Sequence, residues 1–367
     1  MSPEITIIIP VYKVEQYLRQ CLDSVVNQTM RDIQIICVND GSPDNSRTIL
    51  QEYAERDARI EIIDKPNGGL SSARNAALPF VQGKYIMFVD SDDWIDRDCC
   101  EKVFAKAEQT GADITIFFYQ REGITEQYVM YDSITPSDKR TVEEKISLFR
   151  YPTACGKLWR TQFFIGGKFA FPEGLAYEDN YVHWMGVTQA SCISVVPEKF
   201  YHYRYVPDSI VNSHDKNACD YIRIFQLVEK YLDESGYMQT YKDIFLKHKL
   251  GIYHYACHLL LEKERPLFLG TLRRFWSKKD REFCRNASSM FLDTYLREFY
   301  LSHGFGGWRG TLKYHLISIL KYYLTTSKGF FFKTVKWPER LLRHGVIKPL
   351  KKLLGIQKQS PTGKIIK

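Results

Sequence analysis

The sequence lacks several patterns that would assign it to a common protein class. No run of about 20 apolar residues exists, since Lys321 interrupts the best candidate, so a membrane-spanning helix is not expected. Polar and charged residues follow Ile5–Ile9 too soon for a secretory signal peptide. No Gly-x-x-x-x-Gly-Lys-Ser/Thr string occurs, which argues against a P-loop phosphotransferase. The nine cysteines are an odd number without Cys-x-x-Cys spacing, so a reducing cytosolic setting is the simplest interpretation.

Charge is distributed unevenly along the 367 residues, which carry a formal net charge of +8. From Lys313 onward, thirteen Lys and Arg residues stand against Glu339 alone, a net charge of +12. The residues before Lys313 carry 38 basic and 42 acidic side chains, a net of −4. Basic residues alternate with bulky apolar ones in this tail, as in segments that lie on anionic membranes. A solvated or partner-binding face is one alternative. Nucleic-acid binding is disfavoured, because the aromatic residues sit in apolar clusters rather than on a stacking platform.

The first ninety residues alternate between apolar strands and amphipathic helices. Strands are predicted at residues 5–9, 33–38, 60–63 and 85–89, and helices at residues 14–28, 46–56 and from about residue 70. Short connections between them favour an α/β fold with a mostly parallel sheet and right-handed crossovers. In such sheets ligands bind at the carboxyl ends of the strands, where Asp40 and Asp90 fall.

Three carboxylates follow the strand that ends at Val89, in the string Asp90-Ser91-Asp92-Asp93. Repulsion between clustered carboxylates disfavours full ionisation unless a cation lies between them. Oxygen ligands of this kind suit Mg²⁺ or Mn²⁺, which usually bind one or two carboxylates plus substrate phosphates. The alternative is a solvated acidic turn that caps a helix after Trp94.

Five strings in order resemble the inverting glycosyltransferases of family 2, of the bacterial polysaccharide-biosynthesis type. They are Ile9-Pro10-Val11-Tyr12, Val38-Asn39-Asp40-Gly41-Ser42, Gly68-Gly69-Leu70-Ser71-Ser72-Ala73-Arg74-Asn75, Asp90-Ser91-Asp92-Asp93 and Glu178-Asp179. Each string is weak evidence alone, but their order within about 210 residues is specific. The resemblance implies an A-type glycosyltransferase fold with a Rossmann-like sheet. Near His214 the alternation of strands stops and helical periodicity follows, at residues 222–232, 241–261, 290–300 and 314–324. Together with the basic tail, this predicts three regions: a nucleotide-sugar-binding catalytic domain at residues 1–214, a helical domain at 215–328 and a basic amphipathic membrane-associating tail at 329–367.

The resemblance also implies roles for individual residues. The donor-binding residues would be Pro10, Tyr12, Asp40, Gly41, Ser42, Arg74, Asp90 and Ser91. The metal ligands would be Asp92, Asp90 and His214, although a histidine in a polar loop is more often only a loop residue. Lys157 and Glu178 would approach the acceptor or the diphosphate, with a surface lysine as the alternative for Lys157.

Asp179 is the implied catalytic base, which would take a proton from an acceptor hydroxyl. Partial burial beside Tyr177 and Trp184 would raise its pKa, as suits a general base. Glu178-Asp179 also fits the first turn of a helix, and the two interpretations are compatible. A single displacement would invert the anomeric carbon, giving a β-linked product from an α-linked donor.

Together with the basic tail, the resemblance implies a metal-dependent enzyme at the cytoplasmic membrane face, in capsule, exopolysaccharide or O-antigen synthesis. It would transfer a hexose or N-acetylhexosamine from a UDP-sugar to a lipid-linked glycan or polysaccharide. One alternative is an NDP-sugar nucleotidyltransferase, but Pro10-Val11-Tyr12-Lys13 is not the glycine-rich basic loop that such enzymes need after the first strand. Another is a catalytically silent nucleotide-sugar-binding subunit, which the presence of Asp90, Asp92 and Asp179 disfavours.

Overall fold

The computed structural model describes residues 2–123, 129–130, 137–150, 152–206, 217–260 and 264–286. These residues belong to one compact unit. His214, the domain boundary beside it and the tail at residues 329–367 lie outside the described residues and stay predictions.

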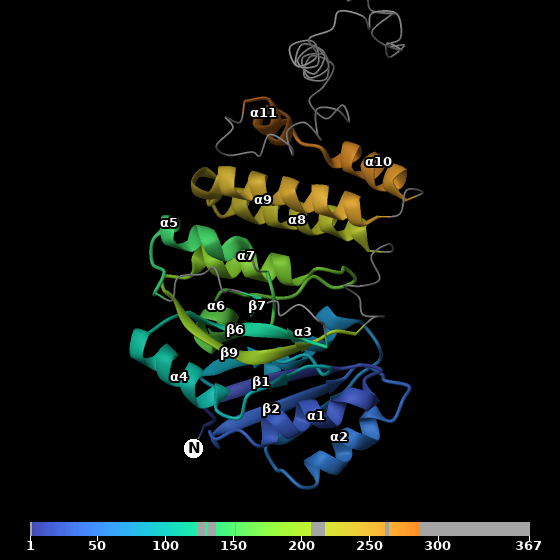
Figure 1. The fold of residues 1–367 in the computed structure, drawn as a ribbon, viewed down its shortest axis with the longest axis vertical. Coiled ribbons are helices and arrows are strands. Elements are labelled where there is room, and N and C mark those ends of the chain that lie inside the picture. The colour runs from blue at the N-terminus through green and yellow to red at the C-terminus, as the bar shows by residue number, and fades with distance from the viewer. Residues whose placement is uncertain are drawn as a thin grey trace, which may run out of the picture. The chain divides into compact units, whose positions relative to one another are not determined.

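Four parallel strands form the N-terminal half of the sheet, in the order β3-β2-β1-β4 (Figure 1). The strands are β1 (Ile5–Val11), β2 (Ile33–Asn39), β3 (Ile60–Asp64) and β4 (Tyr85–Phe88). The connecting helices are α1 (Glu15–Val26), α2 (Ser46–Ala54), α3 (Leu70–Ala77) and the short 3₁₀ helix η1 (Leu78–Phe80). The predicted alternation of strands and helices is confirmed. The apolar runs of β1 and β2 are buried along their whole length, as is typical of parallel strands.

The second half of the sheet adds antiparallel pairings. Its elements are β5 (Trp94–Ile95), α4 (Cys99–Thr110), β6 (Ile114–Glu122), β7 (Val129–Met130), β8 (Lys157–Arg160) and β9 (Ile193–Arg204). The order continues as β4-β8-β6-β9-β5, with β8 antiparallel to β4 and β6 while β6 and β9 are parallel. Trp94 and Ile95 pair with β9, so a short strand follows the Asp90–Asp93 turn and the next helix starts only at Cys99.

The remaining elements are mostly helices. They are α5 (Val142–Lys145), η2 (Ile146–Arg150), α6 (Thr161–Gly166), α7 (Asp179–Gln189), α8 (Ala218–Glu234), α9 (Met238–Leu259), α10 (Arg265–Phe275) and α11 (Lys278–Asn286). Helix α8 packs against α7, and α9 packs against α8 (Figure 1). The helices predicted at residues 222–232 and 241–261 are thereby confirmed, whereas those predicted at 290–300 and 314–324 lie outside the described residues.

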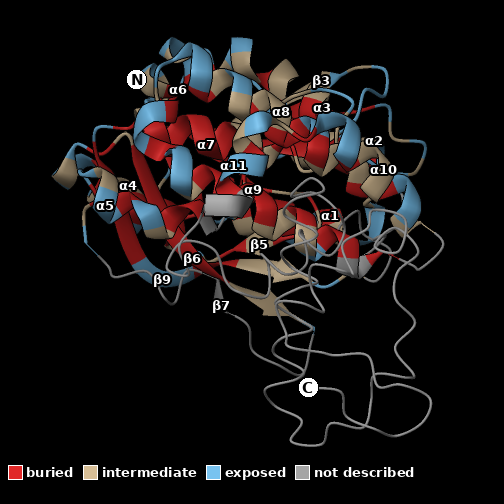
Figure 2. Ribbon diagram, turned by 90° about the horizontal axis from the view of Figure 1, so that it is seen from above, coloured by how far each residue is buried: buried red, intermediate tan, exposed pale blue. Residues whose placement is uncertain are grey.

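The core lies along the sheet and under α7, where Figure 2 shows mostly buried residues. Helix α7 approaches β8 closely because Gly186 has no side chain; a Cβ there would lie 2.5 Å from the ring of Trp159. This packing fixes the start of α7 relative to the sheet. In the part of the chain that the structure describes, no helix has the length and apolar character needed to cross a membrane.

Candidate active site

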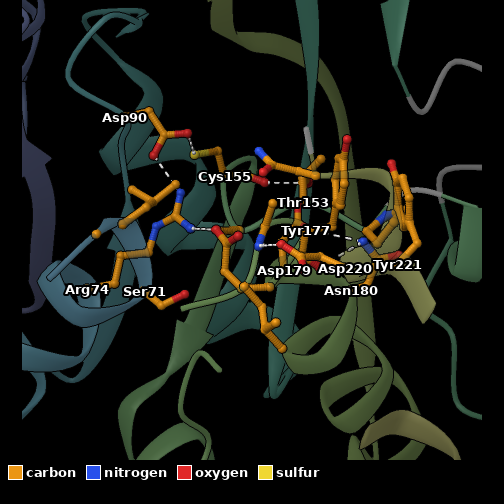
Figure 3. Close-up of a pocket in the computed structure, with 18 of the residues that line it drawn as sticks. Ser71, Arg74, Asp90, Thr153, Cys155, Tyr177, Asp179, Asn180, Asp220 and Tyr221 are labelled. Atoms are coloured by element: carbon orange, nitrogen blue, oxygen red, sulfur yellow. Dashed lines mark hydrogen bonds and ion pairs between the residues drawn. The ribbon is translucent and has the colours of Figure 1, made fainter. Parts of the chain in front are cut away.

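A cavity of about 550 Å³ opens beside the carboxyl end of β4 (Figure 3). Its lining includes two groups of residues that carry chemistry. The first comes from α3 and the loop after β4, and includes Arg74 and Asp90. The second comes from the start of α7 and from α8, and includes Asp179, Asp220 and Tyr221. Residues that are far apart in the sequence, such as Asp90 and Asp179, therefore line one cavity.

Arg74 forms ion pairs with two carboxylates that line the cavity, Asp90 and Glu178. Its Nη2 lies 2.7 Å from Asp90 Oδ1, and its Nη1 lies 2.5 Å from Glu178 Oε1. The guanidinium is buried and lies 5.1 Å from the ring centre of Phe171. The nearby Asp90 and Glu178 carboxylates raise the pKa of Arg74 against the opposing effect of burial, so it is a permanent cation here. Arg74 thus fixes the loop after β4 relative to the start of α7.

Asn75 holds the segment that leads to the candidate base. Its Nδ2 donates to the carbonyl oxygen of Phe171 at 2.8 Å, and its Oδ1 accepts from the Phe171 N–H at 2.8 Å. This two-point contact to the backbone requires both halves of an amide side chain. The Arg74-Asn75 string therefore does structural work that the sequence analysis did not assign to Asn75.

Asp179 is the first residue of α7 and lines the cavity. Burial of the carboxyl group, together with repulsion by Glu178, raises the pKa of Asp179 to about 7, while Arg74 and Lys157 act in the opposite direction. A carboxylate with such a pKa accepts a proton readily at neutral pH. The position at the helix start agrees with both interpretations of Glu178-Asp179 made from the sequence.

Asp92 and Asp93 differ in their surroundings. Asp93 accepts from Tyr201 Oη at 2.7 Å and from the Arg204 N–H at 2.7 Å, so it anchors β9 instead of facing a ligand. Burial and the neighbouring Asp90 carboxylate raise the pKa of Asp92 to about 6. Two carboxylates that disfavour each other's charge are a donor set that a divalent cation would stabilise.

The fit to a metal rests on this pair alone. Asp90 already accepts from Arg74 and, at 3.2 Å, from Cys155 Sγ. Asp92 does not line the cavity. Among the described residues, no group of three or more His, Cys, Asp or Glu side chains is placed to hold a metal ion. His214, the third predicted ligand, lies outside them.

Five of the predicted donor-binding residues lie at the carboxyl ends of β1 and β2. Val11 pairs with Asn39 there, and the Lys13 N–H donates to Ser42 Oγ at 2.8 Å, so the two strings are adjacent. The residues concerned, none of which lines the 550 Å³ cavity, are Pro10, Tyr12, Asp40, Gly41 and Ser42. Ser91, also predicted to bind the donor, is buried and does not line it either.

Asp40 has an additional task within the protein. Its carboxylate accepts from the N–H groups of Gly68 and Gly69 at 2.9 and 2.8 Å and pairs with Lys65 Nζ at 2.6 Å. Gly68 and Gly69 line the cavity and precede α3. Asp40 therefore positions the loop from which Arg74 reaches its partners, and its contact with a nucleotide base stays a prediction.

Lys157 is fully buried, so the alternative of a surface lysine is wrong. Its Nζ donates to Thr153 Oγ1 at 2.8 Å and also to the Thr153 carbonyl oxygen. Burial lowers the pKa of Lys157 to about 7. Lys157 does not line the cavity, but Thr153 does, so the lysine supports the wall from behind.

Several residues that line the cavity were not predicted from the sequence. They are Tyr119 and Arg121 of β6, Tyr203 of β9, Asp220 and Tyr221 of α8, and Ile252 of α9. The aromatic strands at residues 117–119 and 201–205 gave a signal for the first three. For Asp220 and Tyr221 there was none, because both fit an ordinary amphipathic helix.

Comparison with known proteins gives matches along most of the described chain. Residues 6–175 match the family described as Glycosyl transferase family 2. The putative glycosyltransferase EpsH of Bacillus subtilis is 32% identical over 254 residues, which span 66% of this chain and 72% of EpsH. Glycosyltransferase GlyA of Streptococcus pneumoniae is 36% identical over 216 residues, 56% of this chain but only 31% of GlyA.

The solved structure of S. aureus TarS residues 1–349 in complex with UDP-GlcNAc resembles the fold. The TM-score is 0.71 at 18% identity, covering 89% of this chain and 93% of that one. At this identity the match shows the fold alone, and it confirms the A-type fold with a mostly parallel sheet that the sequence predicted.

Proposed function

Because the chain belongs to glycosyltransferase family 2, we propose that it transfers a hexose or N-acetylhexosamine from a UDP-sugar to a lipid-linked glycan, with inversion, in cell-surface polysaccharide synthesis. The observation that supports this proposal most is Asp179. Its carboxyl group has a pKa of about 7 and lines the same cavity as Asp90. Arg74 pairs with Asp90 and with Glu178, the residue directly before Asp179. The complex of TarS with UDP-GlcNAc favours a UDP-sugar as the donor.

In the proposed reaction, Asp179 accepts the proton of an acceptor hydroxyl as that oxygen attacks the anomeric carbon. The bond from the anomeric carbon to the diphosphate breaks, and the electron pair leaves with UDP. Arg74 does not move during this step, because two carboxylates hold its guanidinium. Its task is to keep Asp90 and Glu178 at a fixed distance from each other, so that the donor and the catalytic base stay at a fixed separation.

We propose Mg²⁺ or Mn²⁺ as the cofactor, with Asp90 and Asp92 as ligands in the described residues and His214 as a third. When bound, such an ion would neutralise charge on the diphosphate leaving group. The chain's own contribution is the carboxylate pair of Asp90 and Asp92, in which burial, together with repulsion by Asp90, raises the pKa of Asp92 to about 6. A neutralised pair would hold no cation, so binding should weaken as the pH falls through that value.

The donor and cofactor proposals can be tested together. The full chain is incubated with UDP-glucose, UDP-GlcNAc, UDP-galactose or UDP-GalNAc, with Mg²⁺ or Mn²⁺, and released UDP is measured. We expect one donor to be turned over, with loss of turnover in EDTA and in Asp92→Asn. The matched control is Asp23→Asn, an exposed acidic residue of α1 away from the cavity, and should behave as wild type.

Binding of Mn²⁺ alone, followed by its paramagnetic resonance signal, gives a readout that does not need turnover. Equal Mn²⁺ affinity of wild type and Asp92→Asn would contradict the metal assignment. The absence of UDP release from every donor, in the presence of acceptor glycans, would contradict the donor assignment.

We further propose that residues 329–367 bring the enzyme to the cytoplasmic membrane surface, where a lipid-linked acceptor would lie. This rests on the net charge of +12 after residue 312 and on its alternation with bulky apolar residues. The full chain should float with liposomes that contain anionic lipid, and a chain that ends at Lys328 should float less. Equal flotation of the two chains would contradict the proposal.

A further inference from the structure

The helical region contributes a wall to the cavity, and that wall is aromatic. Tyr221 of α8 stacks on Tyr177, which precedes α7, with ring centres 3.6 Å apart and an angle of 10° between the rings. Both rings line the cavity together with Asp179 (Figure 3). In that view the pair lies on the other side of Asp179 from Asp90. A donor held near Asp90 would leave this end of the cavity for a second substrate.

The backbone at Tyr177 is held in an unusual conformation. Its φ is +64°, in the left-handed region that a bulky side chain rarely adopts. The neighbouring Ala176 N–H donates to Asp220 Oδ2 at 3.1 Å, which ties the loop to α8. An unfavourable conformation that a stack and a hydrogen bond maintain, two residues before the candidate base, points to a function for the ring's position.

We propose that Tyr177 and Tyr221, with the carboxylate of Asp220, bind a neutral pyranose ring of the acceptor glycan next to Asp179. The proposal rests on the proposed function, since it takes Asp179 as the base. One face of a pyranose consists of C–H groups and packs on an aromatic ring, while its hydroxyl groups donate to carboxylates. Each tyrosine covers one face of the other, and both residues line the cavity, where a sugar ring could contact them.

The charges at this end of the cavity favour a neutral ring over a polyol phosphate. Asp179 and Asp220 both line it, and negative charge there would repel a phosphate group. The Arg223 guanidinium, 3.5 Å from Asp220 Oδ1, is mostly exposed and does not line the cavity. The cavity has two lining arginines. Arg74 is engaged by two carboxylates, and Arg121 lies 5.6 Å from the ring centre of Tyr203 on the sheet side. A linear polyol also has no flat apolar face to stack on a tyrosine.

The test uses the full chain with its UDP-sugar donor and two kinds of acceptor probe. The first is a panel of methyl pyranosides with gluco, galacto, manno and N-acetylgluco configurations, and the second is ribitol 5-phosphate. The variants are Tyr221→Ala and Tyr221→Phe. Tyr231→Ala is the matched control, because it removes a tyrosine from the same helix outside the cavity. Transfer and acceptor-free UDP release are measured separately, with melting temperatures for every variant.

We expect Tyr221→Ala to raise the KM for the best pyranoside about tenfold, as the loss of an aromatic contact predicts. The KM for the donor and the acceptor-free UDP release should not change. Tyr221→Phe keeps the ring and should stay close to wild type, as should Tyr231→Ala. A purely structural stack would instead lower the melting temperature and both activities together.

Four results would overturn the subsite. They are an unchanged pyranoside KM in Tyr221→Ala, an equal effect in Tyr231→Ala, transfer to ribitol 5-phosphate in preference to every pyranoside, and donor hydrolysis without transfer to any pyranoside. If wild type releases no UDP from any donor, with or without acceptor, the proposed function fails, and the subsite fails with it for a different and recognisable reason.

Discussion

Two regions of the molecule each bury a cation between two carboxylates. At the cavity, Arg74 of α3 lies between Asp90 and Glu178, at 2.7 and 2.5 Å. The side chains of Arg74 and Glu178 are almost completely buried, while that of Asp90 retains 28% exposure at the cavity. The segments that this cluster joins are up to 104 residues apart in the sequence.

The helical region has its own buried cation, Lys249 of α9. It lies 2.8 Å from Glu229 of α8 and 2.6 Å from Asp280 of α11. All three side chains are mostly or completely buried, and none lines the cavity. This cluster docks one helix on another, whereas the Arg74 cluster also sets the geometry around the candidate base. A buried ion pair thus gives no indication of function by itself, and its place relative to a cavity decides.

The largest effect should come from the base itself. Asp179→Asn removes the proton acceptor but keeps the shape of the side chain, so we expect turnover to fall about 10²- to 10⁴-fold. Binding of UDP-sugar, followed by calorimetry, should change little. Asp280→Asn, in the helical cluster, should leave turnover almost intact. Full turnover in Asp179→Asn would show that the cavity does not use this carboxylate as a base.

The second effect compares the two buried cations directly. Arg74→Met and Lys249→Met each leave carboxylates without their partner, which costs about 3–5 kcal/mol of unfolding free energy when a buried pair is broken. The loss at Arg74 should lie at the lower end, because Asp90 is partly exposed. Urea unfolding measures both. Turnover of the folded fraction should drop only in Arg74→Met, and an equal drop in Lys249→Met would remove the distinction between the regions.

The smallest effect is the pH dependence of transfer. The pKa of Asp179 is raised to about 7 by burial and by Glu178, so below that pH the base is protonated. kcat/KM should therefore rise about tenfold per pH unit up to about pH 7 and then level off. Because the pKa of Asp179 is higher in the folded than in the unfolded chain, protonation of this group stabilises the fold. This stabilisation is complete below the unfolded pKa of about 4 and is lost as the pH rises through about 7.

The pH profile separates this carboxylate from those that only form pairs. In Asp179→Asn the titrating carboxyl group is absent, so the residual kcat/KM should no longer fall as the pH drops below 7. A limb centred near pH 4 in wild type would show that the carboxyl group is better solvated than its surroundings indicate.

Much of the N-terminal half of the sheet, β1 to β4, was predictable from local sequence patterns. Strands such as Ile5–Val11 and Ile33–Asn39 are continuous apolar runs. Of the carboxylates that the resemblance singled out, Asp90 and Asp179 line the cavity, whereas Asp92 does not. The role of Asp93 was not predictable, because its partners Tyr201 and Arg204 come from a strand more than 100 residues later. The burial of Lys157 was hidden for the same reason, since nothing in its neighbourhood distinguishes a buried lysine from a surface one.

The sequence by itself determined which side chains follow the parallel strands, because the strand and helix periods place Asp40 and Asp90 directly after apolar strands. The order of β1 to β4 in the sheet came from the structure. Only the tertiary structure decided which of these side chains meet. The Asp40 carboxylate accepts hydrogen bonds from the N–H groups of Gly68 and Gly69. Tyr221 lines the cavity although the sequence of its helix, α8, contains no recognisable motif. The physical reason is that such contacts depend on how α7 and α8 pack on the sheet, and packing joins residues that no local pattern connects.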